Sequence, residues 1–237
     1  MESVETDRRQ FEFSDATRER ARAIIARYPA GRERSALLPL LHLVQSEQGQ
    51  VTPAGVAFCA EQLGLTKAEV GAVATFYTMY KRRPTGEYLV SVCTNTLCDM
   101  LGGGDIYRRL SADLGVGHDE TTADGTITLE HAECLAACDY APIVTVNYEF
   151  YDNQTPASAK DLVDKLRAGE APAPTRGPAR LCTWRQAARI LAGFEDDQAH
   201  DGPTAAGASL VGLELAKEHG WTAPPAGAKR PAAEEAS

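Results

Sequence analysis

Residues 93–100 read CTNTLCDM, and residues 133–142 read ECLAACDYAP. These two segments hold four of the six cysteines, spaced as Cys93-x4-Cys98 and Cys134-x3-Cys138 with 35 residues between the pairs. Thiolates are soft ligands that select zinc, copper(I) or iron–sulfur clusters, and four thiolates from two loops can close a site around such a centre. The first expectation is therefore a metal centre held by these four cysteines.

The spacing within each pair helps to sort the candidate metals. Structural zinc sites usually take their cysteines in tight pairs with about two to four residues between them. The gaps here are four and three, and the wider gap suits a loop that reaches around two irons, each capped by one pair. Zinc stays open as the alternative, whereas the plant-type order of three close cysteines and a distant fourth does not match.

The segments around the cysteines predict a small α/β domain. Alternating apolar residues from Tyr88 to Val92 indicate a strand that delivers Cys93 at its end. Further strands are expected at 126–130 and 143–147, with helices at 106–114 and 159–166. Strand, helix, strand, strand, helix is a thioredoxin-like order. The 35-residue gap has the length of a crossover, which would bring both cysteine loops to one end of the sheet.

The N-terminal third of the chain predicts a small helical bundle. Helices are expected at about 14–28, 37–48, 52–63 and 66–80. Thr52 before Pro53 is a helix start, and Thr66-x-x-Glu69 is a capping box. We expect Cys59 to be part of the core, and the aromatic stripe ATFYTMY at 74–80 to pack inside the bundle.

Beyond Ala171 the composition shifts to Pro, Ala, Gly and Asp, which is typical of a linker. Two short amphipathic pieces, near Trp184 and Leu210, interrupt it. The tail either folds back on the domain or lies along a partner, and we favour the partner. Cys182 is expected to be a free thiol. The predicted fold is α+β, with a helical bundle at 14–80, a thioredoxin-like α/β domain at 86–169 and an extended tail at 170–237.

Composition excludes several classes of function. A formal net charge of -9 and a pI near 5.1 argue against nucleic acid as a ligand. No run approaches the roughly 20 apolar residues of a spanning helix, so direct membrane insertion is not expected. The acidic opening MESVETDRRQ does not resemble a signal or transit peptide, and the sparse cysteines do not resemble a disulfide scaffold. A reducing cytoplasmic setting is therefore expected.

Several stretches resemble one known family, the small thioredoxin-like 2Fe-2S ferredoxin subunit of the NADH dehydrogenase module of bacterial respiratory complex I, an NADH-quinone oxidoreductase. They are ALLPLLHLVQ, ATFYTMY, VCTNTLC, DGTITLEHAECLAACDYAPIVTVN and YEFYDNQTP, and the match covers about 20–169. Related subunits of NAD-linked formate dehydrogenases and hydrogenases resemble the chain almost as well. Ala136 departs from the family, which usually has glycine there, and the tail lies outside the resemblance.

The resemblance implies that Cys93, Cys98, Cys134 and Cys138 hold one 2Fe-2S cluster and that the chain is an electron-transfer subunit with no catalytic residues of its own. It implies that FMN and NADH bind on a larger partner subunit, and that another, larger iron–sulfur subunit belongs to the same complex. The expected location is the cytoplasmic side of the bacterial plasma membrane, held there through these partners.

Two other functions compete with electron transfer. A zinc-stabilised interaction module ranks second, because the same four thiolates could hold zinc. A thiol oxidoreductase ranks third, because the chain lacks the C-x-x-C pair on which that chemistry usually depends. His131 lies near Cys134 and invites a mixed histidine–cysteine centre, but four cysteines already complete the ligand set. LGGGD at 101–105 lacks the pattern of a phosphate-binding loop.

Overall fold

The computed structural model describes residues 12–195, 202, 205 and 207–223 of the chain. The opening segment, on which the expectation about signal and transit peptides rests, lies outside the described residues. The chain divides into two compact units, 1–204 and 205–237. The three-part division expected from composition stays a prediction.

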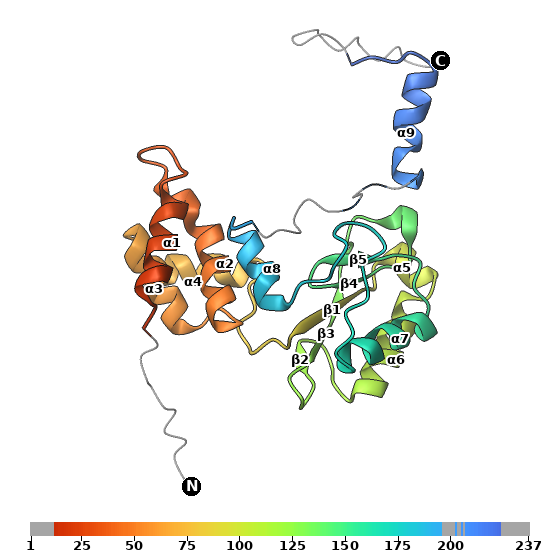
Figure 1. Ribbon diagram of the computed structural model, residues 1–237, viewed down its shortest axis with the longest axis horizontal. Coiled ribbons are helices and arrows are strands. Elements are labelled where there is room, and N and C mark those ends of the chain that lie inside the picture. Colours follow the sequence, from red (N-terminus) through yellow and green to blue (C-terminus); the bar gives the residue numbers. More distant parts are fainter. Residues whose placement is uncertain (1–11, 196–201, 203–204, 206, 224–237) are drawn as a thin grey trace, which may run out of the picture. The chain divides into compact units, whose positions relative to one another are not determined.

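The N-terminal part of the larger unit is helical (Figure 1). It contains, in chain order, α1 (Asp15–Ile25), η1 (Glu33–Ala36), α2 (Leu37–Gln48), α3 (Pro53–Leu63) and α4 (Lys67–Phe76). Thr52 accepts a hydrogen bond from the amide of Gly55, and Thr66 and Glu69 cap each other's backbone amides, as the sequence predicted. Apolar side chains from all four α-helices form one core, in which Cys59 is fully buried.

The aromatic stripe at the end of α4 does not pack as expected. The helix ends at Phe76, because Tyr77 adopts an extended backbone with φ -96° and ψ 128°. Helical periodicity therefore no longer applies from Tyr77 onward. Phe76, the last helical residue, is 76% exposed, Tyr77 is 43% exposed, and Tyr80 is buried. The expectation that this stripe is wholly core is wrong for Phe76 and Tyr77.

The second part of the larger unit is built on a mixed sheet in the order β2-β3-β1-β4-β5. β1 and β3 are parallel, and the other neighbouring strands are antiparallel. The elements are β1 (Tyr88–Cys93), α5 (Thr96–Met100), α6 (Gly103–Leu114), β2 (Glu120–Thr121), β3 (Ile127–Ala132), η2 (Cys138–Tyr140), β4 (Val144–Val146), β5 (Glu149–Tyr151) and α7 (Pro156–Arg167). The expected crossover from β1 through a helix to a parallel strand is confirmed.

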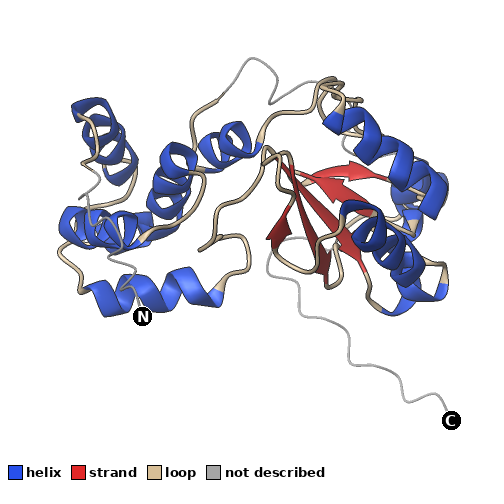
Figure 2. Cartoon of the chain, turned by 90° about the horizontal axis from the view of Figure 1, so that it is seen from below, coloured by secondary structure: helices blue, strands red, loops and turns tan. Residues whose placement is uncertain are grey.

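The two faces of this sheet differ in chemistry. α6 and α7 pack against one face, where Val90 and Val92 of β1 join Ile127 and Leu129 of β3 in an apolar core (Figure 2). Because side chains alternate along a strand, the residues between them point to the other face, which carries Ser91, Thr128, Glu130 and Thr145. The second face is therefore polar and is not part of that core.

The first piece of the tail folds back onto the chain. α8 (Trp184–Leu191) packs against α2, and Trp184 is 1% exposed, with its indole N–H donating to the carbonyl of Gly49 at 2.8 Å. The expectation that this piece lies along a partner is wrong, because its apolar face is already covered. Cys182, just before α8, is buried, and its carbonyl accepts a hydrogen bond from Asn147.

The smaller unit contains α9 (Gly207–Glu218). Its apolar residues are exposed, with Val211 at 49% and Leu213 at 53%. The expectation that this second amphipathic piece lies along a partner stays a prediction. No helix in the described part of the chain is long and apolar enough to cross a membrane.

Candidate metal centre

The first cysteine pair is delivered by the central strand of the sheet. Cys93 is the last residue of β1, where its amide donates to the carbonyl of Ile143 at 3.0 Å. Cys98 follows on the short helix α5. Both residues are 2% exposed and pack with Ala137 and Ile143 in a small cluster of their own.

The second cysteine pair emerges beside the first because β1 and β3 are parallel. The register pairs Cys93 with Ala132, so the loops after both strands begin at the same edge of the sheet. Thr94 donates its amide to Ala132 across the two loops at 3.0 Å. In the second loop the Sγ atoms of Cys134 and Cys138 lie 3.7 Å apart, and both residues are exposed.

The thiols influence one another's protonation. Burial raises the pKa of Cys98 to about 11, with further upward contributions from the neighbouring thiol of Cys93 and the charge of Cys138. The pKa of Cys138 is raised by its hydrogen bond with Cys134, then by the charges of Cys134 and, more weakly, Cys93. Because the raised pKa values of Cys98 and Cys138 oppose their ionisation, a cation beside them would favour their thiolate forms. The donor set therefore fits a cationic metal group.

The thiols are grouped two and two. Cys93 and Cys98 pack in one group of buried residues, and the Sγ atoms of Cys134 and Cys138 lie 3.7 Å apart in the other loop. A centre with two irons needs two thiolates for each iron, and one pair comes from each loop. The residues present thus fit the 2Fe-2S cluster that the sequence predicted, while the role of each cysteine as a ligand stays a prediction.

Backbone features shape both loops. A Cβ on Gly103 would lie 2.9 Å from the carbonyl oxygen of Cys98 and closer still to that of Cys93, so only glycine fits there. In the second loop Ala136 has φ +55°, a left-handed conformation that favours glycine, and its amide lies 3.4 Å from the Sγ atom of Cys134. Alanine at this position therefore strains the backbone, while its amide stays within hydrogen-bonding distance of the thiol.

His131 does not join the thiols. Its ring stacks on His118 with centroids 4.2 Å apart and meets Tyr107 edge-on at 5.7 Å. Asp99, next to Cys98, accepts a hydrogen bond from the amide of Gly104 at the start of α6. The neighbouring polar side chains thus serve the loops and helix ends.

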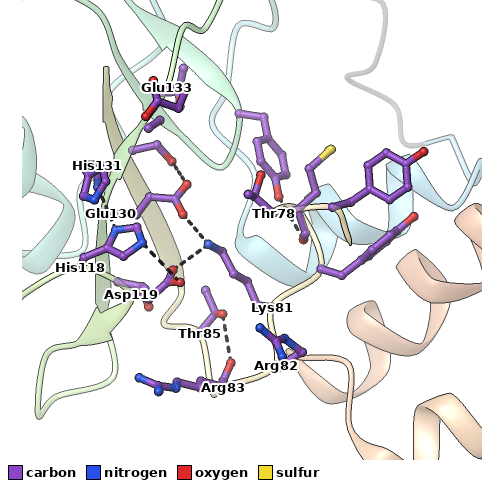
Figure 3. A pocket seen from close by; sticks show the side chains of 18 of the residues that line it. Thr78, Lys81, Arg82, Arg83, Thr85, His118, Asp119, Glu130, His131 and Glu133 are labelled. Atoms are coloured by element: carbon purple, nitrogen blue, oxygen red, sulfur yellow. Dashed lines mark hydrogen bonds and ion pairs between the residues drawn. The ribbon is translucent and has the colours of Figure 1, made fainter. Parts of the chain in front are cut away.

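A pocket of about 950 Å³ lies between residues 74–85 and the polar face of the sheet (Figure 3). Within this pocket the ammonium group of Lys81 bridges Glu130 of β3 and Asp119 (Figure 3). Cys134 also lines the pocket. Sequence reasoning missed the buried ion pair of Lys81, because Lys81 begins a basic run, KRRP, which as a sequence is typical of an exposed segment between two domains. A buried lysine gives no sequence signal of its own.

These features fit one class of protein, a thioredoxin-like metalloprotein with two cysteine pairs in loops at one end of its sheet. The family described as thioredoxin-like [2Fe-2S] ferredoxin matches residues 21–167. The chain belongs to this family, whose members carry a 2Fe-2S cluster.

Individual relatives agree with this assignment. A protein of Mycobacterium tuberculosis that is named as a subunit of NADH-quinone oxidoreductase is 63% identical over 206 residues, which are 86% of this chain and 81% of that protein. The protein of the same name from Rickettsia bellii is 37% identical over 158 residues, 66% of this chain and 95% of that protein.

A solved structure supports the fold. The crystal structure of an NAD+-reducing [NiFe]-hydrogenase in its air-oxidised state matches with a TM-score of 0.51 at 22% identity. The match covers 56% of this chain and 23% of that hydrogenase chain.

Proposed function

We propose that this chain is the component of an NADH-quinone oxidoreductase that carries one 2Fe-2S cluster on Cys93, Cys98, Cys134 and Cys138. The observation that supports this most is the two-and-two grouping of the thiols at one edge of the sheet. When bound, such a cluster supplies one-electron redox chemistry. The chain's own residues hold the centre and shield half of it, since the first pair is buried and the second exposed.

The electron donor in this proposal is a flavin in a partner subunit, which also binds NADH. Hydride donors give electrons in pairs, and a flavin can pass them on singly to iron–sulfur centres. Exposed apolar side chains flank buried Cys98 on α5 and just after it, with Leu97 at 42%, Met100 at 79% and Leu101 at 56% exposure. They provide an apolar surface beside the thiols on which the partner could exclude water.

The names of the relatives indicate an assembly of several subunits, and the composition of that assembly rests on the family resemblance of the sequence. We infer that a larger iron–sulfur subunit also belongs to the complex, and that the chain is peripheral on the cytoplasmic side of the membrane through these partners.

The experiment that tests the centre uses the full chain purified without oxygen. We expect about two irons and two acid-labile sulfides for each chain, a visible absorption band and a paramagnetic signal after reduction. A zinc centre would give metal without sulfide, because four thiolates complete its ligand set, and without colour or a paramagnetic signal, because Zn²⁺ has a filled d shell and no redox chemistry.

Cysteine variants then test the ligands one by one. Serine at position 93, 98, 134 or 138 should abolish or distort the absorption and the paramagnetic signal. Cys59→Ser and Cys182→Ser are matched controls, because both residues are buried cysteines outside the two loops, and they should keep both signals. The assignment is wrong if a control variant loses the cluster while one of the four keeps it unchanged.

Partner exchange is tested separately. The chain is mixed with the flavin-containing subunit, NADH is added, and reduction of the cluster is followed by its paramagnetic signal. Failure of NADH to reduce it, when dithionite does, would contradict the flavin partner while leaving the cluster assignment intact.

A further inference from the structure

The tail runs beside the last strand of the sheet before it reaches α8. Thr175 donates its amide to the carbonyl of Phe150 at 2.9 Å, and Arg176 pairs with Phe150 in an antiparallel bridge. Asp152 donates its amide to the hydroxyl of Thr175 at 3.1 Å. The backbone around Arg176 is therefore fixed by contacts on both sides of Phe150.

The side chain of Arg176 is largely buried between aromatic rings. Its guanidinium carbon lies 4.1 Å from the ring centroid of Phe150 and 5.0 Å from that of Tyr140. Its Nε atom donates to Asp152, with the nearer carboxylate oxygen at 3.1 Å, and the two side chains are 12% and 8% exposed. Within the described part of the chain, the buried Nη2 atom has no hydrogen-bond partner. The charge is thus held mainly by one carboxylate and two ring faces.

The same two rings belong to the surroundings of the thiols. Tyr140 ends η2, which begins at Cys138, so the ring is two residues from a predicted ligand. Tyr140 and Phe150 both pack against the small group of buried side chains that contains Cys93 and Cys98. One layer of aromatic side chains therefore lies between the guanidinium group and the thiol site.

We propose that Arg176 is a positioning residue for the metal centre, which holds the second cysteine loop through Tyr140 and raises the reduction potential of the centre by its charge. This inference rests on the proposed function. Arg176 lies outside residues 21–167, which the family matches. The tail, which composition alone describes as a linker, would then take part in setting the redox properties of this chain.

The direction of the effect follows from charge. In the proposed exchange, one electron leaves the reduced flavin of the partner and enters a centre with four thiolates, which becomes more negative. A nearby cation stabilises the reduced form more than the oxidised form and so raises the potential. Replacing Arg176 by methionine removes the cation and leaves the negative charge of Asp152 uncompensated. The potential therefore falls.

The test is a redox titration of the full chain, purified without oxygen and followed by the paramagnetic signal of the reduced centre. Arg176→Met should lower the midpoint potential while iron content stays unchanged. Arg176→Lys keeps the charge and should stay near the wild-type value. The double variant Arg176→Met with Asp152→Asn removes both charges and should shift less than Arg176→Met alone. Arg180→Met is the matched control, since Arg180 is an exposed arginine of the same tail, and it should not shift.

Distinct outcomes would overturn the inference. A potential unchanged in Arg176→Met at full iron content would contradict it, and so would a shift in Arg176→Lys as large as in Arg176→Met, because the charge would then not matter. Should Arg176→Met lose its iron, Arg176→Gln decides, since glutamine keeps a donor toward Asp152 without the charge. If the midpoint potential of Arg176→Gln lies below that of Arg176→Lys, the charge effect is supported. If the two potentials are equal, the inference is contradicted. A wild-type chain without iron would instead overturn the proposed function itself.

Discussion

Replacing Lys81 by methionine should destabilise the larger unit strongly, because this residue joins its helical part to the sheet. The backbone of Lys81 is held by the helical part, with its amide donating to Gln45 at 2.8 Å and its carbonyl accepting from Val51 at 2.7 Å. Its ammonium group bonds Glu130 and, at 2.8 Å, Asp119. Lys81→Met keeps the backbone bonds and the apolar stem but removes the cation.

The magnitude follows from burial. The side chains of Lys81 and Glu130 are 9% and 13% exposed, and removing one partner of a buried ion pair typically costs about 3–5 kcal/mol. Glu130 keeps a hydrogen bond from Ser91 at 2.5 Å, and Asp119 is 40% exposed, so solvent replaces part of the loss. We therefore expect a cost of about 3 kcal/mol, or a fall in Tm of about 6–12 °C for a unit of this size.

The assay is thermal and urea unfolding followed by circular dichroism, with Lys160→Met as the matched control. Lys160 pairs with Asp164 one turn along α7, and the two side chains are 36% and 56% exposed. An exposed pair of this kind contributes at most about 0.5 kcal/mol. The reasoning is refuted if Lys81→Met costs less than about 1 kcal/mol, or no more than Lys160→Met. Adding Glu130→Gln to Lys81→Met should recover part of the loss, since no charge then stays buried alone.

The pH dependence has a definite sign. Burial would lower the pKa of Lys81, but the charge of Glu130 and the hydrogen bonds and charge of both carboxylates outweigh it and raise the pKa. The stabilisation by Lys81 is therefore complete below its unfolded pKa of about 10.4 and is lost as pH rises through the higher folded value. For the carboxyl group of Asp119, burial alone would raise the pKa, but the hydrogen bond and the charge of Lys81 lower it. That contribution is present above an unfolded pKa of about 3.9 and is lost in stronger acid.

Thermal unfolding and iron content also check three smaller changes. Gly103→Ala should lower the free energy of unfolding by about 1–3 kcal/mol and reduce iron retention, because its Cβ would meet the backbone of the first cysteine loop. Its control is Gly71→Ala, in open space on α4, which should raise the free energy of unfolding by up to about 1 kcal/mol. Trp184→Ala should cost about 3–5 kcal/mol, whereas Trp221→Ala, at 66% exposure, should stay within about 0.5 kcal/mol. Ala136→Gly should raise stability by up to about 1 kcal/mol without loss of iron, since it relieves a positive φ, and a lower Tm would contradict that strain.

Local signals explain which parts of the fold could be predicted from sequence. Thr52 before Pro53 and the pair Thr66 and Glu69 specify helix starts through bonds within four residues, and the structure has both. The meeting of the two cysteine loops followed from the length of the crossover between parallel strands. β2 and β5 were missed, because strands of two and three residues show no period and neither stands in a β-branched run such as the one that revealed β4.

Amphipathic spacing could not indicate where α8 packs. The pattern around Trp184 shows that one face must be buried, but a partner and the chain's own α2 satisfy that requirement equally. The choice depends on a surface formed by distant residues, including the carbonyl of Gly49 that accepts the indole N–H bond. In the same way, the periodicity of ATFYTMY holds only while the helix continues, and the sequence did not reveal that the helix ends at Phe76.

The two cysteine loops are held to different degrees, and this asymmetry gives the outlying residues their importance. The first loop begins on the central strand, and both of its cysteines are buried in protein. The second loop leaves β3 with both cysteines exposed, so fewer contacts hold it. Glu130, four residues before Cys134, ties its strand to Lys81, and Tyr140, two residues after Cys138, stacks under Arg176. The exposed loop is therefore fixed at both ends by cations from outside the sheet, one from the helical part and one from the tail, and neither cation has a signal in the cysteine spacing that predicts the site.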